Sequence, residues 1–281
     1  MIDFHTHPML VREMIAKYPE LETAARKVFF IQNILQPLET FFLELDISGL
    51  ERAVLLPIDA TSTRGCCLYT NEQIAELCAL SDRFVGFASV DPHDSAAPEK
   101  LRRAVEQLGL RGLKLAPPMQ EFYPDDRTLA YPLYEVAQEL RIPVVLHAGM
   151  SWEPGSRAKY GHPMHLEDVA ADFPQLNIVI AHFAWPWVLE AVMLALKYPN
   201  VYIDTSCLYF DNPTDFMRFV IGGQVPVSLI EKSLRNQIVF GSNYPRVEIK
   251  NMARAVRSVG LSEGCLDLIF RDNARHLLGE V

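Results

Sequence analysis

The chain opens with MIDFHTHP (residues 1–8), which we interpret as a β-strand that ends in two histidines. Alternate residues of a strand point to the same side, so His5 and His7 share one face. Two imidazoles placed in this way can bind one divalent ion, provided that other segments supply further ligands. Because such a pair also occurs without a metal, its meaning depends on the rest of the chain.

Seven more apolar runs follow this strand, and segments of helical periodicity separate them. The runs span residues 52–57, 84–90, 112–116, 143–147, 178–182, 201–204 and 238–241. The helical segments span residues 71–80, 98–108, 131–140, 164–173, 187–196, 227–234 and 248–259, and residues 265–278 predict a closing helical pair. Near-continuous apolar strands that alternate with helices are typical of a parallel sheet covered on both faces.

Eight such units in 281 residues predict an α/β fold, a closed (β/α)8 TIM barrel that forms one domain over residues 1–281. An open, doubly wound sheet is the alternative. It is disfavoured because no glycine-rich phosphate-binding turn follows the first strand. In a barrel the chemistry lies at the C-terminal ends of the strands.

Residues 10–45 form a longer connection than one crossover helix requires, and their apolar residues keep a helical rhythm. One interpretation is a helical insertion after the first strand, in which two helices cap the barrel mouth. The other is an ordinary long connection followed by the first barrel helix.

Composition excludes several classes of partner. The formal net charge of −9 argues against nucleic acid or an anionic membrane, since both favour a basic face. No apolar run of 18 residues exists, and the N-terminus lacks the pattern of a signal peptide. Five cysteines without metal-type spacing fit a reducing compartment. We expect a cytoplasmic homo-oligomer that acts on a small molecule.

Two further histidines end predicted strands. His147 closes the fifth and His182 the sixth, so both should project toward the mouth that His5 and His7 face. A single histidine at a strand end is more often a core residue bonded to a backbone carbonyl. Four at one end of a barrel instead indicate a functional site, and imidazole-rich sites suit Zn²⁺, or Mn²⁺ and Fe²⁺ when an oxygen ligand joins.

Other polar residues fall at the same end. Lys114 lies in the apolar frame GLKL (residues 112–115), where a charge is costly unless it serves the mouth. It could bind a substrate carboxylate, be carbamylated and bridge two metals, or extend to a carboxylate at the rim. Asp204 and Ser206 could orient neighbouring histidines. The loop after the fifth strand is of a kind that often carries substrate contacts, and it contains Trp152, Arg157, Tyr160, His162 and His165.

Six motifs occur in a fixed order along the chain: DFHTH (residues 3–7), GLKL (112–115), LHAG (146–149), FPQL to IAH (173–182), VYIDTS (201–206) and FGSNYP (240–245). Together they resemble the amidohydrolase superfamily, in the amidohydrolase-2 branch that contains aminocarboxymuconate-semialdehyde decarboxylase and resorcylate decarboxylases. The resemblance covers the whole chain. It implies that His5, His7 and His147 hold one divalent ion, and that His182 acts as an acid or base on the water at the metal or as a further ligand.

The sequence departs from this family at the eighth strand, which normally ends in aspartate and here ends in Asn243. An amide offers only a neutral oxygen and cannot take a proton. Three interpretations follow: a natural variant that uses His182 as its base, a metal-poor or inactive relative, or a substitution made to trap a complex.

The leading hypothesis is a metal-dependent hydrolase that attacks a carbonyl of a small carboxylated or aromatic substrate, such as an amide, ester, lactone or C–C bond. The predicted metal ligands are His5, His7, His147 and Asn243. The ion that they are expected to bind is Zn²⁺, with Mn²⁺ as the alternative. The predicted catalytic residues are His182 and Asn243.

The predicted substrate contacts are Lys114, Trp152, Arg157, Trp185 and Arg246, with Tyr244 beside them. Arg246 could equally form a salt bridge at the rim. One alternative function is non-oxidative decarboxylation of an aromatic or unsaturated acid. A second alternative is a catalytically impaired barrel that binds a metal or an acid.

Overall fold

The computed structural model describes residues 1–7, 11–206 and 209–280, so that Pro8, Leu10 and Cys207 lie outside the described residues. Its centre is built from eight parallel strands: β1 (Ile2–Thr6), β2 (Arg52–Leu55), β5 (Phe84–Gly86), β6 (Leu113–Leu115), β7 (Val144–Leu146), β8 (Ile178–Ile180), β9 (Val201–Asp204) and β10 (Ile238–Val239). Each lies within one of the eight predicted runs, which confirms the strand predictions.

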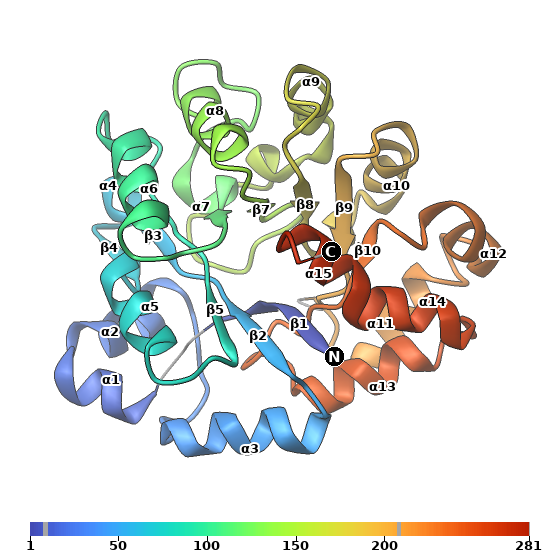
Figure 1. The fold of residues 1–281 in the computed structure, drawn as a ribbon, viewed down its shortest axis with the longest axis horizontal. Helices are drawn as coiled ribbons and strands as arrows, with labels where there is room; N and C mark the ends of the chain where they lie inside the picture. Colours follow the sequence, from blue (N-terminus) through green and yellow to red (C-terminus); the bar gives the residue numbers. More distant parts are fainter. Residues whose placement is uncertain (8–10, 207–208, 281) are drawn as a thin grey trace.

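The strands run in the order expected of a (β/α)8 barrel (Figure 1). One sheet has the order β1-β2-β5 and the other has the order β10-β9-β8-β7-β6. Beyond β5, the amide of Ala88 donates to the carbonyl of Gly112 at 2.7 Å. At the other edge, the amide of Asn243 donates to the carbonyl of His5 at 2.9 Å. Both edges of the first sheet are therefore hydrogen-bonded to the second.

Helices surround these strands, and most of them match predicted segments. The matching helices are α5 (Asn71–Cys78), α6 (Ala97–Glu106), α8 (Tyr131–Glu139), α9 (Leu166–Asp172), α10 (Val188–Lys197), α12 (Val227–Leu229) and α13 (Ile249–Arg257). The closing pair is also present, as α14 (Glu263–Asp267) and α15 (Asn273–Leu277).

Several short elements were not predicted. They are the antiparallel hairpin of β3 (Ile58–Ala60) and β4 (Cys66–Leu68), and the helices α4 (Thr61–Arg64), α7 (Pro117–Gln120) and α11 (Pro213–Val220). The hairpin extends from the C-terminal end of β2, at the same end of the barrel as the histidines.

The connection between β1 and β2 contains features of both interpretations. It holds α1 (Arg12–Lys17), α2 (Glu20–Thr23) with a π-helical continuation (Ala24–Val28), and then α3 (Leu38–Ser48). The ring of Phe41 on α3 stacks on Phe84 of β5 with 5.4 Å between centroids, so α3 packs against the barrel wall. Asn33, before α3, donates from Nδ2 to the carbonyl of Pro245 at 2.8 Å and so contacts the loop after β10.

An irregularity in β1 determines where its first histidine points. Between Asp3 and Thr6 the strand has one residue more than β2 has between the paired Ala53 and Leu55. Such a bulge re-aims a side chain locally. It explains why Phe4 belongs to the interior apolar cluster while the neighbouring ring of His5 also points inward, to Asp204.

Gly149, just after the strand-end His147, has a φ of +91°, and a Cβ there would lie 2.2 Å from the carbonyl oxygen of Trp185. We expect Gly149→Ala to lower the free energy of unfolding by about 2 to 4 kcal/mol, because strain and overlap add. Gly109 is a matched control, since its φ is +73° with no atom within 4 Å of the added Cβ. Gly109→Ala should cost only about 1 to 2 kcal/mol. Urea unfolding of both variants checks this, and equal losses would contradict it.

Among the described residues, no helix combines the length and the apolar character that crossing a membrane would need.

Candidate metal centre

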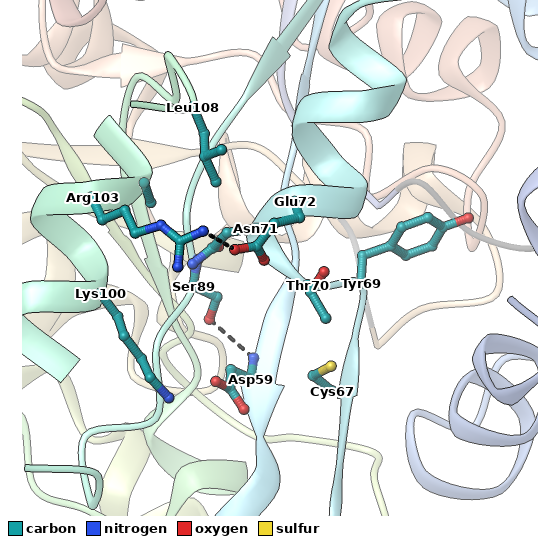
Figure 2. A pocket seen from close by; sticks show the side chains of 11 residues that line it. Asp59, Cys67, Tyr69, Thr70, Asn71, Glu72, Ser89, Lys100, Arg103 and Leu108 are labelled. Atoms are coloured by element: carbon teal, nitrogen blue, oxygen red, sulfur yellow. Dashed lines mark hydrogen bonds and ion pairs between the residues drawn. The ribbon is translucent and has the colours of Figure 1, made fainter. Parts of the chain in front are cut away.

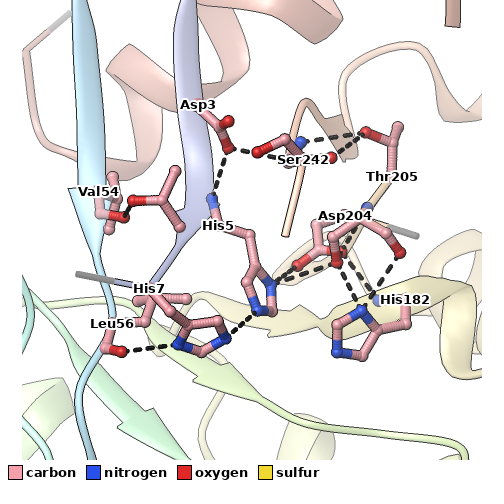
Figure 3. Close-up of polar contacts among 12 residues, drawn as sticks. Asp3, His5, His7, Val54, Leu56, His182, Asp204, Thr205 and Ser242 are labelled. Atoms are coloured by element: carbon pink, nitrogen blue, oxygen red, sulfur yellow. Dashed lines mark hydrogen bonds and ion pairs between the residues drawn. The ribbon is translucent and has the colours of Figure 1, made fainter. Parts of the chain in front are cut away.

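The rings of His5 and His7 are held by hydrogen bonds at one nitrogen each (Figure 3). His5 Nδ1 lies 2.6 Å from Oδ2 of Asp204, and His7 Nδ1 lies 2.9 Å from the carbonyl oxygen of Leu56. Both oxygens are acceptors, so each Nδ1 carries the proton and donates it. Burial lowers the pKa of both histidines well below the ordinary value, so both rings are neutral and each Nε2 keeps a lone pair.

These two Nε2 atoms lie 3.3 Å apart. Two lone pairs that face each other repel, whereas a cation bound to both removes the repulsion. Two nitrogens at tetrahedral positions around Zn²⁺, each about 2.0–2.1 Å from it, lie about 3.3–3.4 Å from each other. The donor set formed by His5 and His7 therefore fits a divalent ion in chemistry and in spacing.

Asp204, at the end of β9, organises the surrounding side chains. Its Oδ2 accepts from His5, and its Oδ1 accepts from the amide of His182 at 2.8 Å and from the amide of Ser206 at 3.0 Å. Ligand atoms of His5, His182 and Asp204 lie within 4.8 Å of one another. Because both carboxylate oxygens already accept hydrogen bonds, Asp204 is better placed to orient the histidines than to bind an ion itself.

His182 has an unusual backbone conformation. It has a φ of +60°, and Phe183 and Ala184 after it also have positive φ values. A left-handed conformation costs about 1–2 kcal/mol for a residue with a Cβ. Three in succession, which begin two residues after the last residue of β8, concentrate backbone strain at the end of the barrel where the histidines gather.

The imidazole of His182 is connected to Asp204 through a hydroxyl group. Ser206 Oγ donates to Oδ1 of Asp204 at 2.5 Å and lies 2.7 Å from His182 Nδ1. Since the hydroxyl proton points to the carboxylate, His182 Nδ1 is the donor to Ser206, and Nε2 carries the lone pair. Burial, together with His147 and His5, lowers the pKa of His182 well below its ordinary value, and Asp204 opposes this. The ring is therefore a neutral base at Nε2.

His147 lies close to this group, with its ring centroid 4.8 Å from that of His182. Its Nε2 is 2.9 Å from the carbonyl oxygen of Met150, to which it must donate. The lone pair of the neutral ring is then on Nδ1. His147 can join a metal ion through Nδ1, or through Nε2 once the contact with Met150 is broken.

An inner pocket of about 20 Å³ lies at this end of the barrel. It is lined by His7, Phe29, Ile58, Leu68, Lys114, His147, Glu153, His182, Asn243 and Arg246. Lys114 is 1% exposed, and its Nζ has no hydrogen-bond partner among the described residues. Burial lowers the pKa of Lys114 to about 8, against the opposing effect of Asp204 and Glu153. A buried amine without a partner suits an anionic ligand.

A larger outer cavity of about 470 Å³ adjoins the inner pocket at Arg246, which lines both. It is lined by Phe30, Ile31, Gln32, Asn33, Trp152, Tyr209, Phe210, Asp211, Arg246 and Val247. The guanidinium of Arg246 donates from Nη2 to the carbonyl of Phe29 at 2.7 Å and lies 3.6 Å from Oε1 of Glu153.

A third cavity, of about 260 Å³, lies between α5, α6 and the β3–β4 hairpin (Figure 2). Its cations are paired, since Arg103 lies 3.4 Å from Glu72 and Lys100 lies 2.6 Å from Asp94. None of the four strand-end histidines lines it. It is therefore a weaker candidate for the catalytic site than the inner pocket.

The structure thus gathers most of the predicted residues in one place. His7, Lys114, His147, His182, Asn243 and Arg246 line the inner pocket, and Trp152 lines the outer cavity. The Nε2 atom of His5 lies 3.3 Å from that of His7. Asn243 has a φ of +66°, a conformation that Asn and Asp adopt more readily than most residues.

Other predicted residues lie elsewhere. Arg157 is exposed and lines neither cavity, and Trp185 packs against Tyr209 with 4.8 Å between ring centroids. Tyr244 stacks on Phe41 of α3 with 5.0 Å between centroids and so faces the helical layer.

His162 and His165 line neither the inner pocket nor the outer cavity, although the loop that contains them was expected to carry substrate contacts. His162 packs on Trp187, and His165 pairs with Asp125 at 2.9 Å.

Four pocket residues were not predicted from the sequence: Phe29, Ile58, Leu68 and Glu153. All four lie in connections between barrel strands, where no periodicity indicates which side chain points inward.

Comparison with known proteins supports this description of the fold. An uncharacterized Tim-barrel protein from Bordetella bronchiseptica has a TM-score of 0.74 and 22% identity, covering 100% of this chain and 98% of that one. A 2,6-dihydroxybenzoate decarboxylase in complex with 2,6-dihydroxybenzoate has a TM-score of 0.70 and 20% identity, covering 99% and 98%. A dihydroxybenzoic acid decarboxylase from Polaromonas, with bound manganese and an inhibitor, has a TM-score of 0.64 and 20% identity, covering 99% and 96%.

Two comparisons of sequence gave matches: a short one to a single protein, and one over nearly the whole chain to a family profile. A stretch of 62 residues is 37% identical to protein fluG of Emericella nidulans, and it spans 22% of this chain and 7% of that protein. A sequence profile described as amidohydrolase matches residues 2–279. The chain belongs to the amidohydrolase family.

Proposed function

We propose that the chain is a metal-dependent hydrolase that acts on a carbonyl group of a small carboxylate. The observation that supports metal dependence most strongly is the pair of neutral, proton-free Nε2 atoms of His5 and His7, 3.3 Å apart. With His147 and the amide oxygen of Asn243 they would hold Zn²⁺ or Mn²⁺. Such an ion would polarise the carbonyl and make a water molecule more acidic.

His182 is the base of this proposal. Its Nε2 would take a proton from the attacking water, and the positive charge that then forms on the ring would be stabilised by Asp204 through Ser206 Oγ. A buried ring that is neutral before the reaction suits this task, because only the neutral form accepts a proton. The same observation favours hydrolysis over a reaction that begins with proton donation by His182.

Lys114 and Arg246 would bind the substrate. Both line the inner pocket, and the buried Nζ of Lys114 has no partner among the described side chains and backbone groups. A carboxylate in the pocket would satisfy that amine and pair with the guanidinium of Arg246. These two cations give an overall acidic protein a local site for an anionic substrate.

A second candidate function is non-oxidative decarboxylation. This reaction is favoured by Lys114 and Arg246, which could hold the departing carboxylate. It is also favoured by the fold that the chain has in common with two hydroxybenzoate decarboxylases. Assays of carboxylated aryl esters, lactones and amides, together with hydroxybenzoates, would separate the two by product. Cleavage without release of CO₂ supports hydrolysis, and release of CO₂ contradicts it.

Asn243 supports a third candidate, a barrel with impaired catalysis. Replacing it with aspartate adds a full negative charge and a proton acceptor at the pocket. The side chains are nearly isosteric, and both residue types tolerate the φ of +66°, so packing should hardly change. We expect Asn243→Asp to raise the affinity for Zn²⁺ or Mn²⁺ about 10- to 100-fold and to raise turnover.

The measurements are metal titration and hydrolysis rates, with Asn251→Asp on α13 as a control outside the pocket. If the Asn243→Asp variant binds metal no better and works no faster than the parent, position 243 does not contact the ion.

A further inference from the structure

We propose that Glu153 occupies the place of the substrate's carboxylate on Arg246 and that an incoming carboxylate has to displace it. This inference rests on the proposed function, since it concerns how the substrate enters the same site. Three observations carry it: the partition between two cavities, their sizes, and the charge of the residues that form the partition.

The partition is built from one arginine and one short piece of loop. Arg246 lines both the inner pocket and the outer cavity. Of two consecutive loop residues, Trp152 lines the outer cavity and Glu153 lines the inner pocket. The contact between Glu153 and Arg246, at 3.6 Å, therefore lies where the two spaces meet.

The sizes of the two spaces show that this partition has to open. The inner pocket, at about 20 Å³, has room for about one water molecule. A substrate that brings both a carbonyl and a carboxylate to Lys114 and His182 cannot enter it as it stands. The outer cavity, at about 470 Å³, falls within the usual range for small-molecule sites of about 300–1,000 Å³.

The charges of Glu153 and Arg246 indicate what kind of molecule can open the partition between the two cavities. The side chain of Glu153 is only 10% exposed, and Ser151 Oγ contacts its other carboxylate oxygen, Oε2. Its negative charge offsets the positive charge of Arg246. The same charge opposes the effect of burial on the pKa values of Lys114 and His147. An incoming carboxylate can take over this balance, whereas two carboxylates at one guanidinium would repel each other. A neutral ligand cannot take over this balance, so it can occupy the outer cavity but does not displace Glu153 from Arg246.

The outer cavity indicates the rest of the molecule. Four aromatic residues line it, namely Phe30, Trp152, Tyr209 and Phe210. Aromatic rings bind flat ring systems by stacking and edge contacts. Benzoate, which joins a flat ring to one carboxylate, is therefore a suitable probe of Arg246 and of this cavity together.

Calorimetric titration with benzoate and with its neutral counterpart benzamide tests the proposal. The variants are Glu153→Gln, which removes the competing charge at constant shape, and Glu167→Gln, which removes a surface carboxylate paired with Lys197 at 2.7 Å. We expect Glu153→Gln to bind benzoate about tenfold more tightly than the parent and to bind benzamide with unchanged affinity. The Glu167→Gln variant should bind both ligands as the parent does. In the double variant Glu153→Gln/Arg246→Gln, the gain in benzoate affinity should be absent.

Each titration is made on metal-loaded protein and repeated after chelation. The contrast between benzoate and benzamide does not need the ion, so it survives if the proposed hydrolysis fails. Unchanged benzoate affinity in a folded Glu153→Gln protein overturns the inference. So does an equal gain for benzoate and benzamide, which would mean that Glu153 only fills space. A loss of turnover without any change in binding would overturn it as well, and would place Glu153 in the reaction itself.

Discussion

Replacing His182 with asparagine is expected to lower turnover by about 10²- to 10⁴-fold while the metal ion remains bound. The imidazole is neutral, its Nδ1 donates to Ser206 Oγ, and its Nε2 is left as a proton acceptor in the inner pocket. Asparagine offers an amide that cannot take a proton. The neighbouring Asn243 cannot take over this task for the same reason.

Turnover and metal content should be measured on the same preparations. Ser206→Ala keeps the base but removes the hydroxyl between His182 and Asp204, so it should lose less activity, about 10- to 100-fold. His162→Asn, on a loop outside the pocket, is the matched control and should behave as the parent. If metal and activity disappear together in His182→Asn, this histidine is a ligand and the base is another group.

Replacing His7 with alanine is expected to lower metal affinity by more than about 100-fold and to abolish turnover. Loss of a partner that only orients a ligand already costs about 10- to 100-fold in affinity, so loss of a ligand should exceed that. The physical reason is the pair of Nε2 atoms 3.3 Å apart, because one lone pair alone holds a divalent ion far less tightly than two.

Metal content after dialysis, followed by titration with Zn²⁺ and Mn²⁺, measures this effect. His5→Ala and His147→Ala should show the same loss. His165→Ala should retain the metal, since that ring pairs with Asp125 outside the pocket. Equal retention in all four variants would remove His5, His7 and His147 from the ligand set.

The strand and helix order could be predicted because it rests on local patterns. Apart from β1, each barrel strand is a largely apolar run that is buried on both faces, and each covering helix repeats apolar residues every three or four positions. The β3–β4 hairpin and α7 were missed because three- or four-residue elements carry too little pattern. The hairpin nevertheless contributes Ile58 and Leu68 to the inner pocket.

Sequence by itself determined the fold class and the residue types that meet at the barrel mouth. Strands in parallel end at the same side, so polar residues at strand ends must gather there. His5, His147 and His182 could be assigned on this ground.

The tertiary structure alone decided how these residues face one another. The bulge in β1 turns His5 inward, and three left-handed residues redirect the chain at His182. Asp204 accepts hydrogen bonds from the ring of His5 and from the backbone amide of His182. Glu153 enters the pocket from a loop that no periodicity describes. Secondary structure follows from neighbours along the chain, whereas side-chain direction, proton position and cavity shape follow from contacts between residues far apart in sequence, and these exist only once the chain has folded.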